Sequence, residues 1–107
     1  MYTYYGTVVH VVDGDTVDVE LDLGFDVKIK QRVRLLGVNC AERFTDEGKL
    51  ATAFVQEWVK DHGPVLVTTQ KNTYDKYGRY VAEISGVYGD LLSTDLLTKG
   101  LATPYPV

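Results

Sequence analysis

TVVHVVDGDTVDVELDL, residues 7–23, has the most regular pattern in this chain. β-Branched residues dominate its first part and stop at the turn pair Asp13-Gly14, after which apolar and acidic residues alternate. This pattern predicts two strands joined by a hairpin turn, the second of them half-buried with an acidic outer face. Counting back in twos from Val17 places Asp15 on the inward face, where a buried carboxylate needs a partner such as a cation.

Three further strands are predicted downstream, over residues 27–38, 65–71 and 80–84. Residues 47–60 have apolar side chains at helical spacing, which predicts a helix capped by Thr45 or Asp46. We expect its wide apolar stripe to close one end of the sheet. The stripe consists of Leu50, Ala51, Phe54, Val55, Trp58 and Val59.

A shorter helix is predicted near the C-terminus. Asp90 can cap it, Leu92 and Leu96 would face inward, and Gly100 follows just past its end. Five strands, with a helix between the third and the fourth and a short C-terminal helix, match the plan of a five-stranded OB-fold barrel. The predicted fold is therefore β-rich α+β, of a type that often binds oligonucleotides.

Length and composition limit the classes of protein. A chain of 107 residues supports one hydrophobic core, so we expect one domain over residues 1–107. The net charge of −4 excludes a protein that coats nucleic acid through bulk positive charge, because such binding scales with the number of phosphates neutralised. The single cysteine, Cys40, excludes an intramolecular disulfide and a cysteine cluster for zinc.

The hydropathy pattern bears on location. No stretch approaches the ~18 consecutive apolar residues of a membrane span, so we expect no membrane partner. The N-terminus also lacks a positive region followed by an apolar run. This predicts a cytoplasmic protein as the sequence stands, or a secreted one if a signal peptide has been trimmed.

Three short segments contain the residues suited to chemistry on phosphate: DGDT at 13–16, VRLLGVNCAE at 33–42 and DKYGR at 75–79. Taken singly, the first and third would be ordinary polar turns. The middle segment is harder to explain as structure alone, because Arg34 lies in an apolar strand, where it requires an anion. Glu42 then follows in the loop before the predicted helix. Together, the segments indicate a phosphodiester-cleaving site.

In this order along the chain, the three segments resemble the staphylococcal nuclease (thermonuclease) family. The resemblance runs from about residue 8 to residue 105 and includes KGLA at 99–102, which is similar to the segment that closes the family's barrel. Members of that family are OB-fold nucleases that require Ca²⁺, cut DNA and RNA, and leave 3′-phosphates. The resemblance therefore implies a nuclease with calcium as its cofactor.

The resemblance also implies a set of metal ligands. Asp15 would bind calcium directly, together with the backbone carbonyl of Cys40. Asp13 would lie next to these ligands without binding the ion directly. Asn39 stands where the family usually has a second ligating aspartate. Its amide oxygen can still coordinate calcium but brings no negative charge. We therefore expect calcium to bind more weakly, by about one to a few kcal/mol.

Catalytic and substrate-binding roles follow from the same resemblance. Glu42 would be the general base beside the attacking water, and Arg34 and Arg79 would hold the scissile phosphate. Arginine suits this role because its paired donors match two phosphate oxygens at once. Outside the scissile phosphate, Lys76 and Tyr77 would hold a neighbouring phosphate. Tyr105 would form an aromatic wall beside the nucleotide.

We expect a monomer that cleaves DNA or RNA, preferably single-stranded, with metal affinity weakened by Asn39. An alternative is a non-catalytic OB-fold module that binds nucleic acid or protein and whose metal site has decayed. Asn39 and the acidic composition favour this alternative. A third possibility is an OB-type scaffold without a nucleotide ligand.

Overall fold

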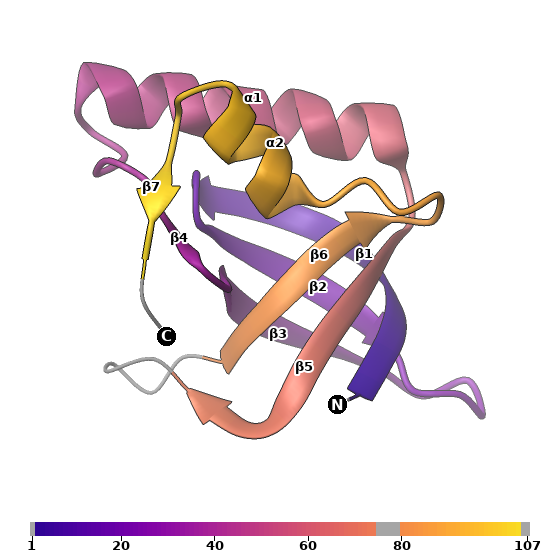
Figure 1. Cartoon of the computed structure of the whole chain (residues 1–107). Helices are drawn as coiled ribbons and strands as arrows, with labels where there is room; N and C mark the ends of the chain where they lie inside the picture. Colours follow the sequence, from indigo (N-terminus) through magenta and orange to yellow (C-terminus); the bar gives the residue numbers. More distant parts are fainter. Residues whose placement is uncertain (1, 75–79, 106–107) are drawn as a thin grey trace.

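Five strands close into a barrel in the order β1-β2-β3-β6-β5 (Figure 1). The computed structural model describes residues 2–74 and 80–105, with side chains omitted for residues 70–74. The barrel strands are β1 (Tyr2–Asp13), β2 (Thr16–Asp22), β3 (Lys28–Leu35), β5 (Val65–Tyr74) and β6 (Tyr80–Gly86). All pairings are antiparallel except that of β3 with β6, which is parallel. The chain has the predicted five-stranded OB-fold.

The alternating pattern of β2 fills the barrel. Val17, Val19 and Leu21 are buried, and Val17 lies opposite Val33 of β3. The acidic side chains between them face outward, where Asp18 forms an ion pair with Arg32 at 2.8 Å. Leu23, the last apolar residue of this alternating pattern, lies beyond the end of β2 and is exposed.

Helix α1 (Asp46–His62) lies across one end of the barrel (Figure 1). The Thr45 hydroxyl caps it by accepting a hydrogen bond from the Gly48 N–H at 3.0 Å, as one of the two predicted caps would. The helix buries Ala51, Val55 and Trp58, which recur at i, i+4 and i+7. The predicted stripe is too wide, because Leu50 is 62% exposed.

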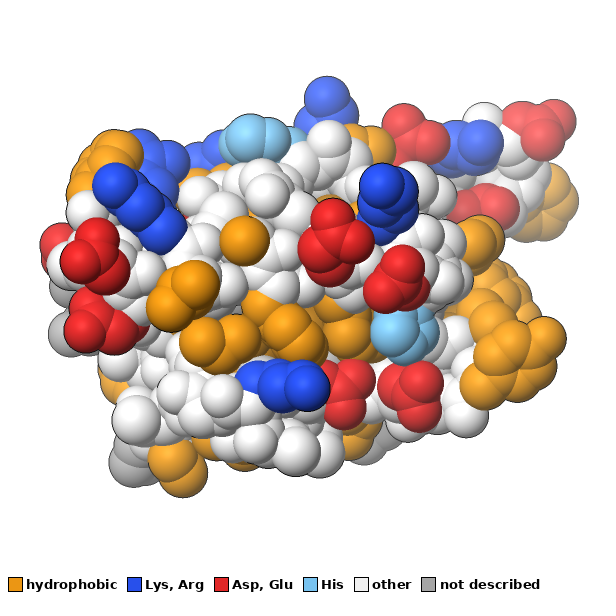
Figure 2. Space-filling model, turned by 90° about the horizontal axis from the view of Figure 1, so that it is seen from above, with side chains coloured by type: hydrophobic (Ala, Val, Ile, Leu, Met, Phe, Trp, Pro, Cys, Tyr) orange, Lys and Arg blue, Asp and Glu red, His pale blue; other side chains and the backbone are white. Residues whose placement is uncertain are grey.

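Helix α2 (Leu92–Thr98) packs beside α1 with Leu92 and Leu96 buried, as predicted. Its predicted cap is wrong: the N-cap residue is Leu91, which makes no side-chain capping bond. The Asp90 carboxylate instead lies 3.2 Å from Nε2 of His62. Seen from above, the layer formed by the two helices presents hydrophobic side chains between charged ones (Figure 2).

Two short strands outside the barrel were not predicted. β4 (Val38–Asn39) pairs with β7 (Thr103–Pro104) in a separate two-stranded sheet. The predicted strand over residues 27–38 is interrupted because Gly37 has a φ of 81°, a conformation that glycine adopts at little cost. This break turns the chain out of the barrel and toward β7. In the described part of the chain, no helix is both long enough and apolar enough to cross a membrane.

His62 connects the end of α1 to the loop before α2. Its ring stacks on Trp58 with centroids 3.9 Å apart, and its Nδ1 lies 2.8 Å from the Trp58 carbonyl oxygen. Burial lowers the pKa of His62, but the bond to the Trp58 carbonyl and the carboxylates of Asp90 and Asp95 outweigh that effect. The pKa is therefore raised above its ordinary value. Protonated His62 is thus the form that stabilises this contact.

We expect this contact to make the stability of the protein depend on pH. Because the folded-state pKa is raised, the contribution is complete below the unfolded value of about 6.5 and disappears as pH rises through the folded value. Urea unfolding between pH 5.5 and 8.5, followed by Trp58 fluorescence, should therefore show stability falling with rising pH. The variant His62→Gln should have a smaller slope, keeping only the part up to about pH 6 that the raised pKa of Asp13 contributes, and His10→Gln should keep the full slope. The same slope in His62→Gln would contradict the assignment.

Candidate active site

Asp15 occupies the turn between β1 and β2 and is only 7% exposed, as its register predicts. Its Oδ2 accepts a hydrogen bond from the Cys40 N–H at 2.9 Å, and its Oδ1 accepts one from the Thr16 hydroxyl at 3.1 Å. The resemblance pointed to the Cys40 carbonyl, and the bond from the Cys40 amide was not foreseen. These donors hold the carboxylate in place before any ligand binds.

Asp13 lies beside Asp15 and accepts its N–H at 3.1 Å. Burial, reinforced by the nearby Asp15 carboxylate, raises the pKa of Asp13 to about 6. Burial, with the same two carboxylates, also raises the pKa of the Cys40 thiol to about 12. Cys40 is therefore a thiol at neutral pH and is unsuited to nucleophilic attack.

Arg34 lies near the end of β3, opposite Thr16, and is 6% exposed. Its Nη1 donates to the carbonyl oxygens of Leu35 and Val38, at 3.1 and 3.0 Å. Its Nη2 donates to Oδ1 of Asn39 at 2.9 Å and lies 3.7 Å from Oδ2 of Asp15. The guanidinium is thus held in one orientation beside the buried acid.

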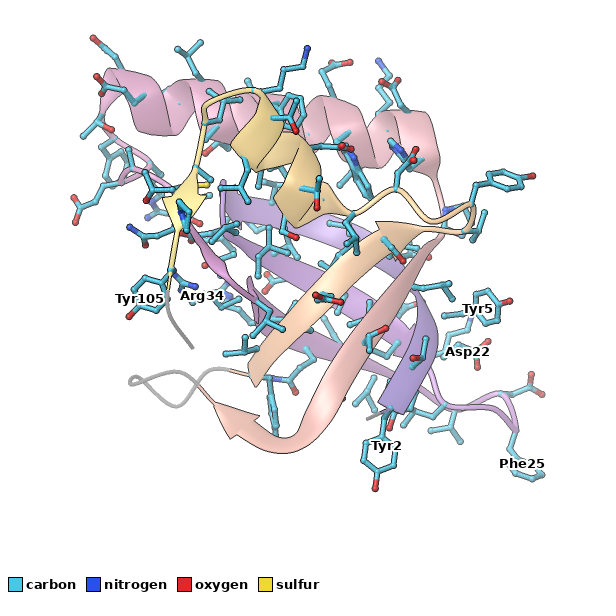
Figure 3. The ribbon with its side chains drawn as sticks, in the orientation of Figure 1. Tyr2, Tyr5, Asp22, Phe25, Arg34 and Tyr105 are labelled. Carbon is cyan, nitrogen blue, oxygen red and sulfur yellow. The ribbon has the colours of Figure 1, made fainter. Side chains whose placement is uncertain are left out.

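Tyr105 lies against Arg34, with the guanidinium carbon 4.6 Å from the centre of the ring. The pairing of β7 with β4 positions it, and the Tyr105 N–H donates to the Gly37 carbonyl at 2.9 Å. Figure 3 shows the two side chains together on one side of the barrel, away from the exposed aromatic rings of Tyr2 and Phe25. The described contacts therefore join the following predicted residues: Asp13, Asp15, Arg34, Asn39, Cys40 and Tyr105.

Glu42 lies on the loop that leads from this group to α1, and its side chain is exposed. Its carbonyl oxygen accepts hydrogen bonds from the Thr45 N–H at 3.0 Å and the Thr45 hydroxyl at 2.7 Å. Among the described residues, no hydrogen bond or ion pair joins the Glu42 carboxylate to Asp15 or Arg34. These bonds fix the backbone of Glu42, and its carboxylate is exposed to solvent.

Gly48 allows this placement of Glu42, although it was not among the predicted site residues. A Cβ at position 48 would lie 1.7 Å from the Glu42 carbonyl oxygen, so only glycine fits. Glycine has low helix propensity, so its presence in the first turn of the predicted helix was the one sequence signal that could have pointed to this position. The remaining predicted residues, Lys76, Tyr77 and Arg79, lie outside the described residues.

A cavity of about 450 Å³ lies against Asn39, Cys40 and Ala41. Residues at the start of α1 and residues 100–103 form its other walls. Leu50 also lines it, which explains why this leucine is exposed. The space is of the size that proteins use for small ligands.

The oxygen donors fit a hard cation such as Ca²⁺. A cation would reduce both the cost of burying the Asp13 carboxylate, which is the main cause of its raised pKa, and its smaller repulsion by Asp15. The Asn39 amide oxygen has a second lone pair besides the one that Arg34 uses. In the described part of the chain, no three Asp, Glu, His or Cys side chains form a metal-ligand cluster. An ion here would therefore depend on few charged ligands.

The fold and the site together define the class of protein: an OB-fold domain in which Asp13 lies beside Asp15 and Asp15 lies beside Arg34. Residues 32–107 match the model of the staphylococcal nuclease homologue family, and the chain belongs to this family. A protein of Escherichia coli named an uncharacterized endonuclease is 27% identical over 101 residues, which cover 94% of this chain and 61% of the relative. An uncharacterized protein of Bacillus anthracis is 34% identical over 88 residues, 77% of this chain and 39% of the relative. The chain thus spans about three fifths of the length of the E. coli relative.

Proposed function

We propose that this protein is a calcium-dependent nuclease that acts, as a monomer, on DNA or RNA and prefers single strands. The observation that carries the proposal is the buried Arg34, fixed beside Asp15 and covered by the Tyr105 ring. Membership of the staphylococcal nuclease family supports nuclease chemistry, as does the name of the E. coli relative.

The proposed roles follow from the chemistry of phosphodiester hydrolysis, which builds negative charge on the phosphate oxygens. Arg34 and Arg79 hold the scissile phosphate, and Glu42 takes a proton from the attacking water. A second group contacts the rest of the nucleotide: Lys76, Tyr77 and Tyr105.

Asp15, Asn39 and the Cys40 carbonyl would hold the calcium ion, supported by Asp13. When bound, the ion would supply positive charge that polarises the phosphate.

Asn39→Asp tests the metal site. Adding a carboxylate to the ligand set should lower the calcium concentration needed for half-maximal nuclease activity by about 10- to 100-fold. Activity on a labelled single-stranded oligonucleotide, measured over a wide calcium range, gives this value. Gln31→Glu adds the same charge at a half-buried position of β3, three residues before Arg34, and should leave the calcium requirement unchanged. Equal calcium curves for Asn39→Asp and the unaltered protein would refute the proposed role of Asn39.

A second candidate is the binding module without catalysis. It is favoured by the hydrogen bonds that the Asp15 and Asn39 oxygens already receive from Cys40, Thr16 and Arg34. On this hypothesis the protein binds an oligonucleotide equally well with and without calcium and does not cleave it. Calcium-dependent cleavage by the unaltered protein excludes the second candidate.

A further inference from the structure

A second groove lies on the other side of the Glu42 loop. It has a volume of about 420 Å³ and is lined by Val12, Arg43, Phe44, Lys49, Thr52, Ala53 and Gln56. It runs between the end of β1, the loop before α1 and the outer face of the first half of α1.

The groove combines free cations with an exposed aromatic ring. Phe44 is 77% exposed, and the Arg43 guanidinium carbon lies 4.7 Å from the centre of its ring. Among the residues that the structure describes, no carboxylate lies within 4.0 Å of the charged nitrogens of Arg43 or Lys49. Arg32, in contrast, is paired with Asp18. In a chain of net charge −4, two unpaired cations in one groove mark it as a local site for an anion.

The position of the groove relates it to the candidate active site. Val12 directly precedes Asp13, and Arg43 directly follows Glu42. The groove therefore borders the loop that leads from the candidate active site to α1. Figure 2 shows basic and hydrophobic side chains at the end of the molecule where α1 begins, with acidic side chains beside them.

We propose that this groove binds one further nucleotide of single-stranded DNA or RNA, beyond the nucleotide at the cleaved bond. The base stacks on Phe44, and Arg43 and Lys49 bind its phosphate. Aromatic rings with nearby cations are the usual means of holding single strands without reading their sequence. The volume of the groove suits one nucleotide and not a duplex. The choice of ligand rests on the proposed nuclease function, and the groove deepens that function by extending its substrate.

Binding of two fluorescently labelled oligonucleotides, a dinucleotide and an octanucleotide, tests this inference in the absence of added divalent metal. We expect Phe44→Ala to weaken octanucleotide binding about tenfold and to change dinucleotide binding less than about twofold. The double variant Arg43→Gln, Lys49→Gln should reduce the salt dependence of octanucleotide binding. Because these side chains are at the surface, urea unfolding should show that the variants remain folded.

Matched controls use residues away from the groove. Tyr88→Ala removes another fully exposed ring and Lys60→Gln another cation of α1, and both should bind like the unaltered protein. The inference is overturned if the octanucleotide does not bind, if Phe44→Ala weakens both lengths equally, or if the controls weaken binding as much.

Cleavage is measured separately, so the two hypotheses can fail independently. A protein that binds through Phe44 but never cleaves contradicts the proposed nuclease alone. A protein that cleaves but binds equally well without Phe44 contradicts the groove alone.

Discussion

Glu42→Gln is expected to lower the nuclease rate by roughly 10²- to 10⁴-fold, the usual contribution of a general base. The amide keeps the size of the side chain but cannot accept a proton from water. Folding should be unchanged, because the exposed carboxylate makes none of the contacts that fix the loop, which come from the Glu42 carbonyl. The rate is measured on a labelled oligonucleotide at saturating calcium.

The matched control for this variant is Glu57→Gln, an exposed residue of α1. It removes a carboxylate that does not line the cavity beside the candidate active site, and it should leave the rate within about twofold. Activity of Glu42→Gln close to that of Glu57→Gln would remove Glu42 from the mechanism. A loss in Glu42→Gln that extra calcium restores would instead assign Glu42 to the metal site.

Arg34→Met is expected to have the largest effect on stability, lowering the free energy of unfolding by about 3–5 kcal/mol. The substitution leaves the buried Asp15 carboxylate without its cation and removes the donor from the Leu35 and Val38 carbonyls. Activity should also be lost, because the phosphate would lose a guanidinium. Urea unfolding followed by Trp58 fluorescence gives the stability, and the rate is measured well below the unfolding midpoint.

Arg32→Met is the matched control on the same strand. Its ion pair with Asp18 is exposed, with 54% of the Arg32 side chain accessible, so the loss should be at most about 1 kcal/mol. Arg34→Lys keeps the charge without the planar fork, so it should recover part of the stability but little of the activity. Equal destabilisation by Arg34→Met and Arg32→Met would show that the buried contacts of Arg34 contribute little.

The fold was predictable where local pattern and tertiary contacts agree. Alternation placed Asp15 inside, and a hydroxyl at position 45 capped α1. The prediction failed where a distant partner competes with the local pattern. Asp90 bonds to His62 instead of capping α2, and Leu50 lines a cavity instead of the core.

The candidate site was predictable in its residue types but not in its contacts. Two-residue strands have no periodicity, so the β4–β7 pairing that brings Tyr105 to Arg34 had no sequence signal. The bond from the Cys40 amide to Asp15 likewise depends on the turn at Gly37, which sequence spacing does not reveal. The sequence pattern identified Asp15 and Arg34 as candidate site residues. Only the tertiary structure showed that Arg34 lies beside Asp15 and donates to Asn39.

The pairing of β4 with β7 also determines when the site is complete during synthesis. Its first acids are at residues 13 and 15, whereas the ring that covers Arg34 is at residue 105. A nascent chain on the ribosome can therefore begin its first hairpin early, yet it has no finished site until residue 105 has emerged.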